Sequence, residues 1–352
     1  MINGLLSKKS SWEKLAESEN PIVIYGMGNG ADKVLDELYR LGIRVEGVFA
    51  SDAFVRGQSF RGFKVKKLSD FEQEFGTLNV AVAFATCIDE VIENVLSIAE
   101  RHTVLVPCVP VYGDEIFNRS FVEQYKGELE AAYSLMSDGK SKEVFRGCVQ
   151  FLFGGELDDL MRITTDKDEA FNGILKLGDN EDYLDLGAYR GDTVEEFLHY
   201  TGCRYSSVTA VEADRKTFAK LEKYLADVEN ARAIRAAVCE KDGIVCFDSA
   251  AGRQSTISDS GEETAAVCVD SLCDGRRVSY IKADVEGAES DMLDGARKTL
   301  AQWKPKLNVA AYHRSYDIFS LALKINEINP DYKIYLRRHK YIPCWDMNLY
   351  CI

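Results

Sequence analysis

The chain has 352 residues, of which 46% are hydrophobic and 28% charged, a composition typical of a folded protein with two domains. Its net charge of −14 excludes a broad nucleic-acid surface, which requires clustered Lys and Arg. No apolar stretch is long enough to span a bilayer and the N-terminus lacks a signal-peptide core, so we predict a cytoplasmic protein. The ten cysteines form no CxxC pair, which indicates buried reduced thiols and no structural metal.

Segments typical of strands and helices alternate in two series, which predicts an α/β chain with parallel sheets and crossover helices. Residues 1–115 are predicted to form a Rossmann-like N-terminal domain, residues 116–180 a helical connector, and residues 181–352 a second α/β domain. In the first series we expect strands at residues 21–25, 45–49, 80–85 and 103–106, and helices at residues 32–41 and 88–99.

The first glycine-rich turn, Gly26-Met27-Gly28-Asn29-Gly30-Ala31, fits a dinucleotide fingerprint because it follows a strand and precedes a helix. Asp52 lies beyond the next strand, where such sites place an acidic residue. Gly26, Gly28, Gly30 and Asp52 are therefore a candidate nucleotide-binding set that could hold NAD. No candidate hydride-transfer acid accompanies them in this half of the chain, which weighs against a dehydrogenase.

The second series predicts a doubly wound sheet that ends in an antiparallel β-hairpin. We expect its strands at residues 183–186, 207–211, 233–238, 244–247, 278–283, 307–311, 333–336 and 348–352. Helices are expected at residues 193–199, 216–225, 290–300 and 318–328. A dense basic run, residues 337–340, lies between the last two strands, and we interpret it as a solvated turn rather than a phosphate contact.

The second glycine-rich turn, in the segment Asp185-Leu186-Gly187-Ala188-Tyr189-Arg190-Gly191-Asp192-Thr193, joins a short apolar strand to a helix. Glycines at such a turn let the backbone approach a ligand closely. We expect Asp192 or Thr193 to cap the helix, a role that is compatible with ligand binding. Domains that bind NAD, FAD or S-adenosylmethionine (SAM) all use such a turn, so this segment alone indicates only a nucleotide-like ligand.

Three features favour SAM over a dinucleotide. Asp185 lies in the strand just before the glycines, within reach of the cationic methionine end of SAM. The turn lacks the full GxGxxG spacing that suits a pyrophosphate. Glu212 ends the next strand, where its carboxylate can accept hydrogen bonds from two ribose hydroxyls. The alternative is that Glu212 is only a solvated acid at a strand end.

A polar segment at residues 281–289 places Asp284 at the carboxyl edge of the sheet, where open α/β sheets bind ligands. Glu286 and Glu289 follow, and Glu289 suits a structural role at a helix N-terminus. His313 follows the next strand and is the best single candidate for the base that accepts a hydroxyl proton, because its ordinary pKa lies near 6.5. Asp284 could be that base instead, or His313 could simply pack at a strand end. The spacing of these residues is not a metal motif, so we predict no metal.

Taken together, the segments DLGAYRGDT, VEAD, IKADVEGAE and the C-terminal tail resemble the FkbM family of SAM-dependent methyltransferases, from about residue 182 to the C-terminus. The resemblance implies the class I Rossmann-like methyltransferase fold and methylation of hydroxyl oxygens, often on sugars or natural products. It implies that SAM is held by Asp185, Gly187, Ala188, Gly191, Asp192, Thr193, Glu212 and Ala213. It places Asp284, Glu286 and His313 on the acceptor side. Ala213 stands where the family commonly has proline, and Ala283 where it has a larger residue.

The N-terminal segment, from about residue 21 to 106, resembles the small Rossmann-like domain at the front of sugar acyltransferases and of many FkbM-type chains. That resemblance implies a nucleotide or nucleotide-sugar site, or a fold retained without a ligand.

We therefore predict a SAM-dependent O-methyltransferase that acts on a hydroxyl of a saccharide, nucleotide sugar or related small metabolite, as in polysaccharide biosynthesis. One alternative is an NAD-dependent sugar oxidoreductase that uses the N-terminal domain, and another is a non-catalytic sugar-binding module. The expected partner is a small-molecule or glycan acceptor, with no nucleic acid and no membrane span. The sequence allows a homo-oligomer without establishing one.

Overall fold

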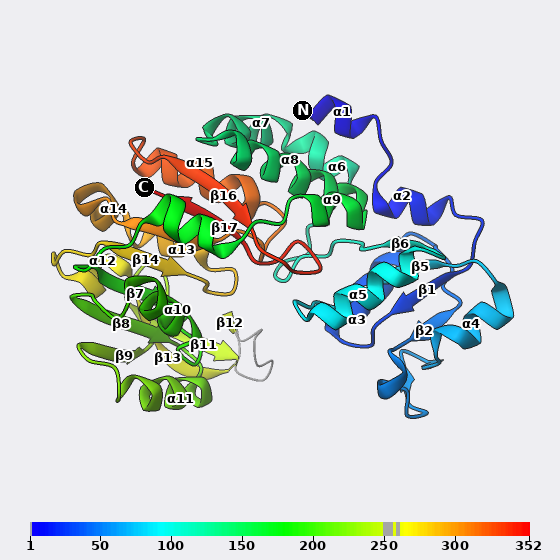
Figure 1. Cartoon of the computed structure of the whole chain (residues 1–352), viewed down its shortest axis with the longest axis horizontal. Coiled ribbons are helices and arrows are strands. Elements are labelled where there is room, and N and C mark those ends of the chain that lie inside the picture. Colours follow the sequence, from blue (N-terminus) through cyan, green and yellow to red (C-terminus); the bar gives the residue numbers. More distant parts are fainter. Residues whose placement is uncertain (1, 249–255, 258–260) are drawn as a thin grey trace.

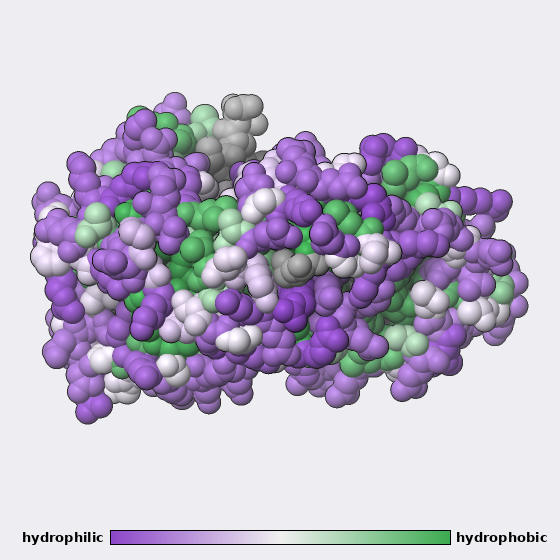
Figure 2. Space-filling view, turned by 90° about the horizontal axis from the view of Figure 1, so that it is seen from above, coloured by the Kyte–Doolittle hydropathy of each residue, from purple (hydrophilic) through white to green (hydrophobic). Residues whose placement is uncertain are grey.

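The protein is described by a computed structural model for residues 2–248, 256–257 and 261–352. Figure 1 shows a smaller sheet from the N-terminal third of the chain, in blue and cyan, beside a larger sheet in green to red. The face shown in Figure 2 is mostly hydrophilic, with hydrophobic side chains visible mainly where the surface is hollowed. In the described part of the chain, no helix has the length and apolar character needed to cross a bilayer.

The N-terminal sheet contains β1 (Ile22–Tyr25), β2 (Gly47–Phe49), β5 (Asn79–Val82) and β6 (Thr103–Leu105) in the order β2-β1-β5-β6. All its strand pairs are parallel, as predicted. Every residue of β1 and β5 is buried, which explains why these strands are continuous apolar runs rather than alternating ones. The helices beside this sheet are α3 (Asn29–Arg40), α4 (Leu68–Phe75) and α5 (Asp89–Ala99). The remaining elements are α1 (Ile2–Leu6), α2 (Ser11–Ala16), η1 (Asp52–Phe54), β3 (Ser59–Phe60) and β4 (Phe63–Lys64).

The larger sheet has the strand order β16-β17-β15-β14-β7-β8-β9. Its strands are β7 (Asp182–Leu186), β8 (Ser207–Glu212), β9 (Ala231–Arg235), β14 (Tyr280–Ala283), β15 (Lys306–Ala310), β16 (Ile334–Arg338) and β17 (Met347–Cys351). Strand β17 is antiparallel to both neighbours and the other pairs are parallel, which confirms the predicted doubly wound sheet with a C-terminal hairpin. The chain runs outward from β7 in one direction and from β14 in the other, so the two adjacent strands form the switch point where such sheets bind ligands.

Helices α10 (Asp192–Thr201), α11 (Arg215–Leu225), α12 (Val269–Cys273), α13 (Glu289–Asp294), α14 (Arg297–Trp303) and α15 (Asp317–Ile328) connect these strands. The single helix predicted at residues 290–300 is two helices, because the chain breaks at Gly295. A side chain at Gly295 would lie 2.6 Å from the Cys239 carbonyl oxygen, and the Asp270 carboxylate caps α14 by accepting from the Lys298 and Thr299 amides.

A small separate sheet was missed by the sequence prediction. It pairs β10 (Ala237–Val238), β13 (Glu262–Val267), β11 (Gly243–Asp248) and β12 (Thr256–Ile257). The strand predicted at residues 233–238 is divided between the two sheets, with β9 in the larger sheet and β10 in the small one.

The connecting helices are α6 (Arg119–Gln124), α7 (Lys126–Leu135), α8 (Gly139–Gly154), α9 (Leu157–Arg162) and the π-helix η2 (Glu169–Leu175). They pack on the hairpin edge of the larger sheet, where the Ser137 amide donates to the Ile334 carbonyl (2.9 Å). The interpretation of residues 337–340 as a solvated turn was wrong. Arg337 and Arg338 belong to β16 and are 2% and 0% exposed, because their partners lie on the connecting helices, far away in the sequence.

Replacement of Arg337 by Met is expected to lower the free energy of unfolding by about 2 kcal/mol. The Arg337 guanidinium pairs with Asp138 and Glu169, both at 2.8 Å, and these partly exposed carboxylates would recover only some of their hydration. Urea unfolding measures the loss. Lys340→Met is the matched control, since the exposed Lys340–Asp89 pair should contribute less than about 1 kcal/mol. Equal losses in both variants would contradict the assignment of a buried ion pair.

Candidate functional site

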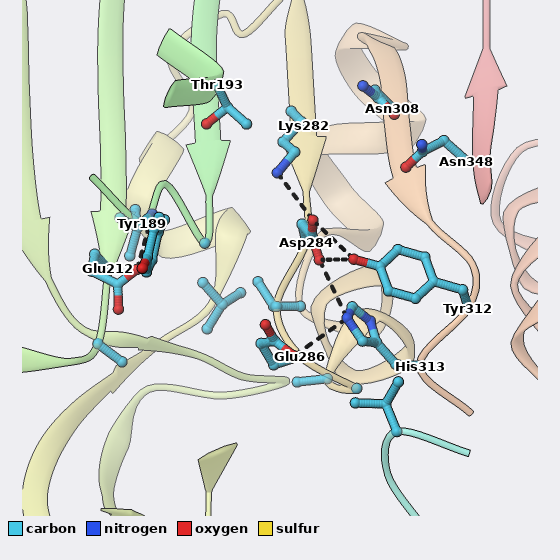
Figure 3. Close-up of a pocket in the computed structure, with 18 of the residues that line it drawn as sticks. Tyr189, Thr193, Glu212, Lys282, Asp284, Glu286, Asn308, Tyr312, His313 and Asn348 are labelled. Atoms are coloured by element: carbon cyan, nitrogen blue, oxygen red, sulfur yellow. Dashed lines mark hydrogen bonds and ion pairs between the residues drawn. The ribbon is translucent and has the colours of Figure 1, made fainter. Parts of the chain in front are cut away.

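A cavity of about 770 Å³ opens at the switch point, at the carboxyl ends of β7, β8 and β14. Five of the predicted cofactor residues line it: Gly187, Asp192, Thr193, Glu212 and Ala213. The three residues predicted for the acceptor side, Asp284, Glu286 and His313, also line it. The structure thus brings most of the two predicted sets into one cavity, and Figure 3 shows Thr193 and Glu212 on one side of it and Asp284, Glu286 and His313 on the other.

Two glycines shape the turn after β7. Gly187 has a φ of +79°, and a side chain there would lie 1.9 Å from the Asp284 carbonyl oxygen. The turn therefore packs directly against the loop after β14, which only glycine permits. Gly191 has a φ of +96°, and a side chain there would lie 2.4 Å from the Tyr224 ring. Gly191 and the buried Ala188 lie behind the cavity wall, so they shape the turn without facing the cavity.

Asp185 is fully buried behind the same turn rather than in the cavity wall. Its Oδ2 accepts a hydrogen bond from the Thr193 hydroxyl, and its Oδ1 has no hydrogen-bond partner among the described residues. Burial raises the pKa of Asp185 to about 6. The predicted capping of α10 by Asp192 or Thr193 is wrong, because the N-cap residue is Gly191 and the Thr193 hydroxyl is used by Asp185.

Glu212 ends β8 at the cavity wall, with both carboxylate oxygens held by backbone amides. Oε2 accepts from the Tyr189 amide (3.0 Å) and Oε1 from the Asp214 amide (2.8 Å). Burial nevertheless raises the pKa of Glu212 to about 7, so the carboxylate has fewer hydrogen-bond donors than its ionised form requires. A ligand that brings two hydroxyl donors would satisfy it. These contacts contradict the alternative of a freely solvated acid.

On the other side of the cavity, Asp284 is surrounded by donors. Its Oδ2 lies 3.5 Å from the Lys282 ammonium, and the Tyr312 hydroxyl lies 3.3 Å from Oδ1. Burial alone would raise the pKa of Asp284, but the charges of Lys282 and His313 hold it below its ordinary value. Asp284 is therefore ionised at neutral pH.

His313 is 1% exposed and lies among three carboxylates. Its Nε2 is 3.4 Å from both Asp284 Oδ1 and Glu286 Oε2, and its Nδ1 is 2.9 Å from Glu289 Oε1. Burial would lower the pKa of His313, but the three carboxylates, with Glu289 first, raise it to about 10. The ordinary histidine pKa near 6.5, which made His313 a candidate base in the sequence, therefore does not apply to it. His313 carries a proton at neutral pH.

The pKa of the neighbouring Glu286 is raised as well. Burial raises the pKa of Glu286 to about 8, an effect that His313 opposes and the neighbouring Asp284 and Glu289 reinforce. Glu289 has the structural role predicted for it, since its Oε1 accepts from the Val285 amide (2.9 Å). Ligand atoms of Asp284, Glu289 and His313 lie within 4.8 Å of one another, close enough to share a cation. A cation there would displace the proton of His313 and would lie close to the Lys282 ammonium.

Sequence reasoning missed several polar residues in the cavity wall. Lys282 and Asn308 occupy paired positions on β14 and β15, and Asn348 lies nearby on β17 (Figure 3). All three are buried, and Asn308 Oδ1 has no hydrogen-bond partner in the described chain. The sequence did carry a signal for these three residues, because each is a charged or amide side chain within an otherwise apolar strand. Tyr312, next to His313, was also missed.

Of the N-terminal candidate residues, Gly28 and Gly30 both line a second cavity, and Gly26 and Asp52 lie outside it. Gly26 and Gly30 pack against the carboxyl end of β5, where a side chain at Gly30 would lie 2.6 Å from the Ala83 carbonyl oxygen. Gly28 has open space at its Cα where it lines the second cavity. Asp52 is exposed, pairs with Lys67 (2.9 Å) and lines neither cavity. Two of these glycines therefore serve helix–sheet packing.

Residues 185–342 match the family model described as a methyltransferase FkbM domain. Among solved structures, the chain is similar to methyltransferase FkbM from Methylobacillus flagellatus KT, with 18% identity and a TM-score of 0.72 over 100% of this chain and 93% of that chain. It is less similar to Aeropyrum pernix fibrillarin with natively bound S-adenosyl-L-methionine, with 16% identity and a TM-score of 0.34 over 51% of this chain and 70% of that chain. Comparison with curated proteins gives no match. The first similarity confirms the predicted fold.

Proposed function

We propose that the protein transfers the methyl group of SAM to a hydroxyl oxygen of a saccharide, nucleotide sugar or related small metabolite, because residues 185–342 match the model of a methyltransferase FkbM domain. The observation that carries the choice of SAM is Glu212. Its carboxylate lines the cavity, is held by two backbone amides and still has a raised pKa, so two ribose hydroxyls are fitting partners.

The residues around Glu212 fit the rest of the cofactor. The Gly187 turn leaves room for the ligand beside β7, and Thr193 and Asp192 line the same wall. The cavity of about 770 Å³ falls within the range of sites for cofactors and drug-sized ligands. When bound, SAM supplies an electrophilic methyl group on a sulfonium centre.

The acceptor side must hold a hydroxyl in line with that methyl group and remove its proton. Alignment and exclusion of water contribute most to such a displacement. Asp284, ionised and beside the Tyr312 hydroxyl, is suited to accept a hydrogen bond from the acceptor hydroxyl and orient it. His313 cannot accept the proton near neutral pH because it already carries one. Instead its charge holds Asp284 and Glu286 in place.

Glu286 is the better candidate for the base. A general base works best when its pKa lies near the working pH, and the pKa of Glu286 is raised to about 8. Its carboxylate lines the cavity beside Asp284. In this assignment the hydroxyl proton would pass to Glu286 as the carbon–oxygen bond forms and the carbon–sulfur bond of SAM breaks, with S-adenosylhomocysteine as the leaving group.

Two measurements test the function. Calorimetric titration with S-adenosylhomocysteine (SAH) and with NAD should show SAH binding, whereas binding of NAD alone would contradict the proposal. Incubation with methyl-labelled SAM and a fraction of nucleotide sugars and oligosaccharides should give labelled methyl ethers by mass spectrometry. Asp284→Ala should abolish these products and keep SAH affinity.

The rate of methyl transfer to an acceptor found in that screen is expected to rise with pH. The raised pKa of Glu286 means that the group is largely protonated at pH 7 and becomes a base as the pH passes about 8. A kcat/KM profile from pH 6 to 9.5 should therefore increase, reach half its maximum near pH 8 and level off above about pH 9. Glu286→Gln should be slow at every pH. A profile in this variant identical to that of the parent would exclude Glu286 as the base.

A further inference from the structure

A second cavity, of about 270 Å³, lies between the N-terminal sheet and the methyltransferase domain. We call it the interdomain cavity. Residues after β5 and β6, such as Phe84 and Pro110, form one wall, and residues after β15 and before β17, such as Ala311 and Trp345, form the other. Neither domain alone would enclose it.

The interdomain cavity adjoins the methyl-transfer cavity, because Tyr312, Arg314 and Trp345 line both. The Tyr312 hydroxyl lies 3.3 Å from Asp284 at the methyl-transfer side. The Tyr312 ring stacks on Trp345, with ring centroids 6.1 Å apart and an interplanar angle of 27°. A ligand that extends from Asp284 past Tyr312 would therefore enter the interdomain cavity.

The walls of the interdomain cavity are held by bonds between the two domains. The Thr86 amide donates to the Ile342 carbonyl (2.7 Å) and the Ile342 amide donates back to the Thr86 carbonyl (2.8 Å). The Tyr112 amide donates to the His313 carbonyl (2.9 Å), next to the three carboxylates around that histidine. These hydrogen bonds fix the cavity walls before a ligand binds, so binding costs less conformational entropy.

The lining is mostly apolar. Val, Ala, Phe, Pro, Leu, Ile, Met and Trp side chains dominate, and the Arg314 guanidinium is engaged, since its Nε donates to the Gly287 carbonyl (2.9 Å). A free sugar placed there would lose more hydrogen bonds to water than the few polar side chains of the lining can replace. An apolar group would gain from burial, and the cavity is larger than the roughly 150 Å³ that holds benzene in an engineered core.

We propose that the interdomain cavity binds an apolar part of the methyl acceptor, while the acceptor's hydroxyl lies at Asp284 and Tyr312. This inference rests on the proposed function and narrows it. The acceptor is a hydroxyl compound with an apolar group attached, such as a glycoside with an apolar aglycone, and not a free sugar.

The full-length protein saturated with SAH tests this with two simple alcohols, 1-hexanol and 1-propanol, by saturation-transfer NMR titration. Each buried methylene strengthens binding about fourfold, so 1-hexanol should bind about 60-fold more tightly than 1-propanol. Ala85→Trp, which fills the interdomain cavity from a half-buried position, should weaken 1-hexanol binding at least tenfold. Ala53→Trp, exposed and outside both cavities, is the matched control.

Gly28→Leu is a second filling variant. Gly28 has an extended backbone (φ −116°), with no atom within 4 Å of an added Cβ, so folding should be preserved. Equal affinities for the two alcohols, or unchanged 1-hexanol binding in both filling variants, would overturn the inference. Absence of SAH binding by the unmodified protein would instead overturn the proposed function, so the two failures are distinguishable.

Discussion

Glu212→Ala is expected to weaken SAH binding about 100-fold. The carboxylate would accept two charge-assisted hydrogen bonds from ribose hydroxyls, and such bonds contribute about 1.5–3 kcal/mol each. Calorimetric titration measures the loss directly. Glu195→Ala is the control, because Glu195 is exposed on the neighbouring helix and does not line the cavity.

The pH dependence of SAH binding gives an independent check on Glu212. The raised pKa of Glu212, about 7 without ligand, means that acid protonates the carboxylate before hydroxyl donors can bind to its ionised form. SAH affinity should therefore fall as the pH drops below 7, approaching tenfold per pH unit, and Glu212→Ala should lose most of this dependence. An affinity that is independent of pH in the parent protein, or a Glu212→Ala variant with normal affinity, would contradict the assignment.

His313→Ala is expected to lower the free energy of unfolding by about 3–5 kcal/mol near pH 6.5. The substitution leaves three carboxylates, Asp284, Glu286 and Glu289, without the buried cation between them. Methyl transfer should also be lost, because the loop that carries Asp284 and Glu286 would rearrange. Urea unfolding and a methyl-transfer assay measure the two effects.

The direction in which stability changes with pH distinguishes an electrostatic role of His313 from a packing role. Because the pKa of His313 is raised from 6.5 to about 10, its stabilising charge is fully present below pH 6.5 and disappears as the pH rises through 10. The stability difference between the parent and His313→Ala should therefore shrink between pH 6.5 and 9.5. A difference that stays constant would indicate packing only. His199→Ala, at an exposed position on α10, should show no difference at either pH.

The local pattern of the sequence was enough to predict most of the architecture. Continuous apolar runs such as β1 and β5, separated by amphipathic helices, indicate parallel sheets, because each strand must bury both faces. Residues that follow such strands must meet at one edge, which is why the strand pattern alone brings Glu212, Asp284 and His313 to a common site.

Only the tertiary structure decided the surroundings of these residues. The sequence cannot show that Asp185 lies behind the turn, that Arg337 is buried against the connecting helices, or that three carboxylates keep His313 protonated. Each of these properties depends on the distance between groups that lie far apart in the chain, and on the exclusion of water around them. The interdomain cavity also depends on tertiary structure, because its walls come from two distant parts of the chain. No local hydrophobic pattern shows how these two parts pack against each other. The sequence by itself determined which side chains meet at the carboxyl edge of the larger sheet, whereas the ionisation of these groups and the shape of the space beside them come from packing.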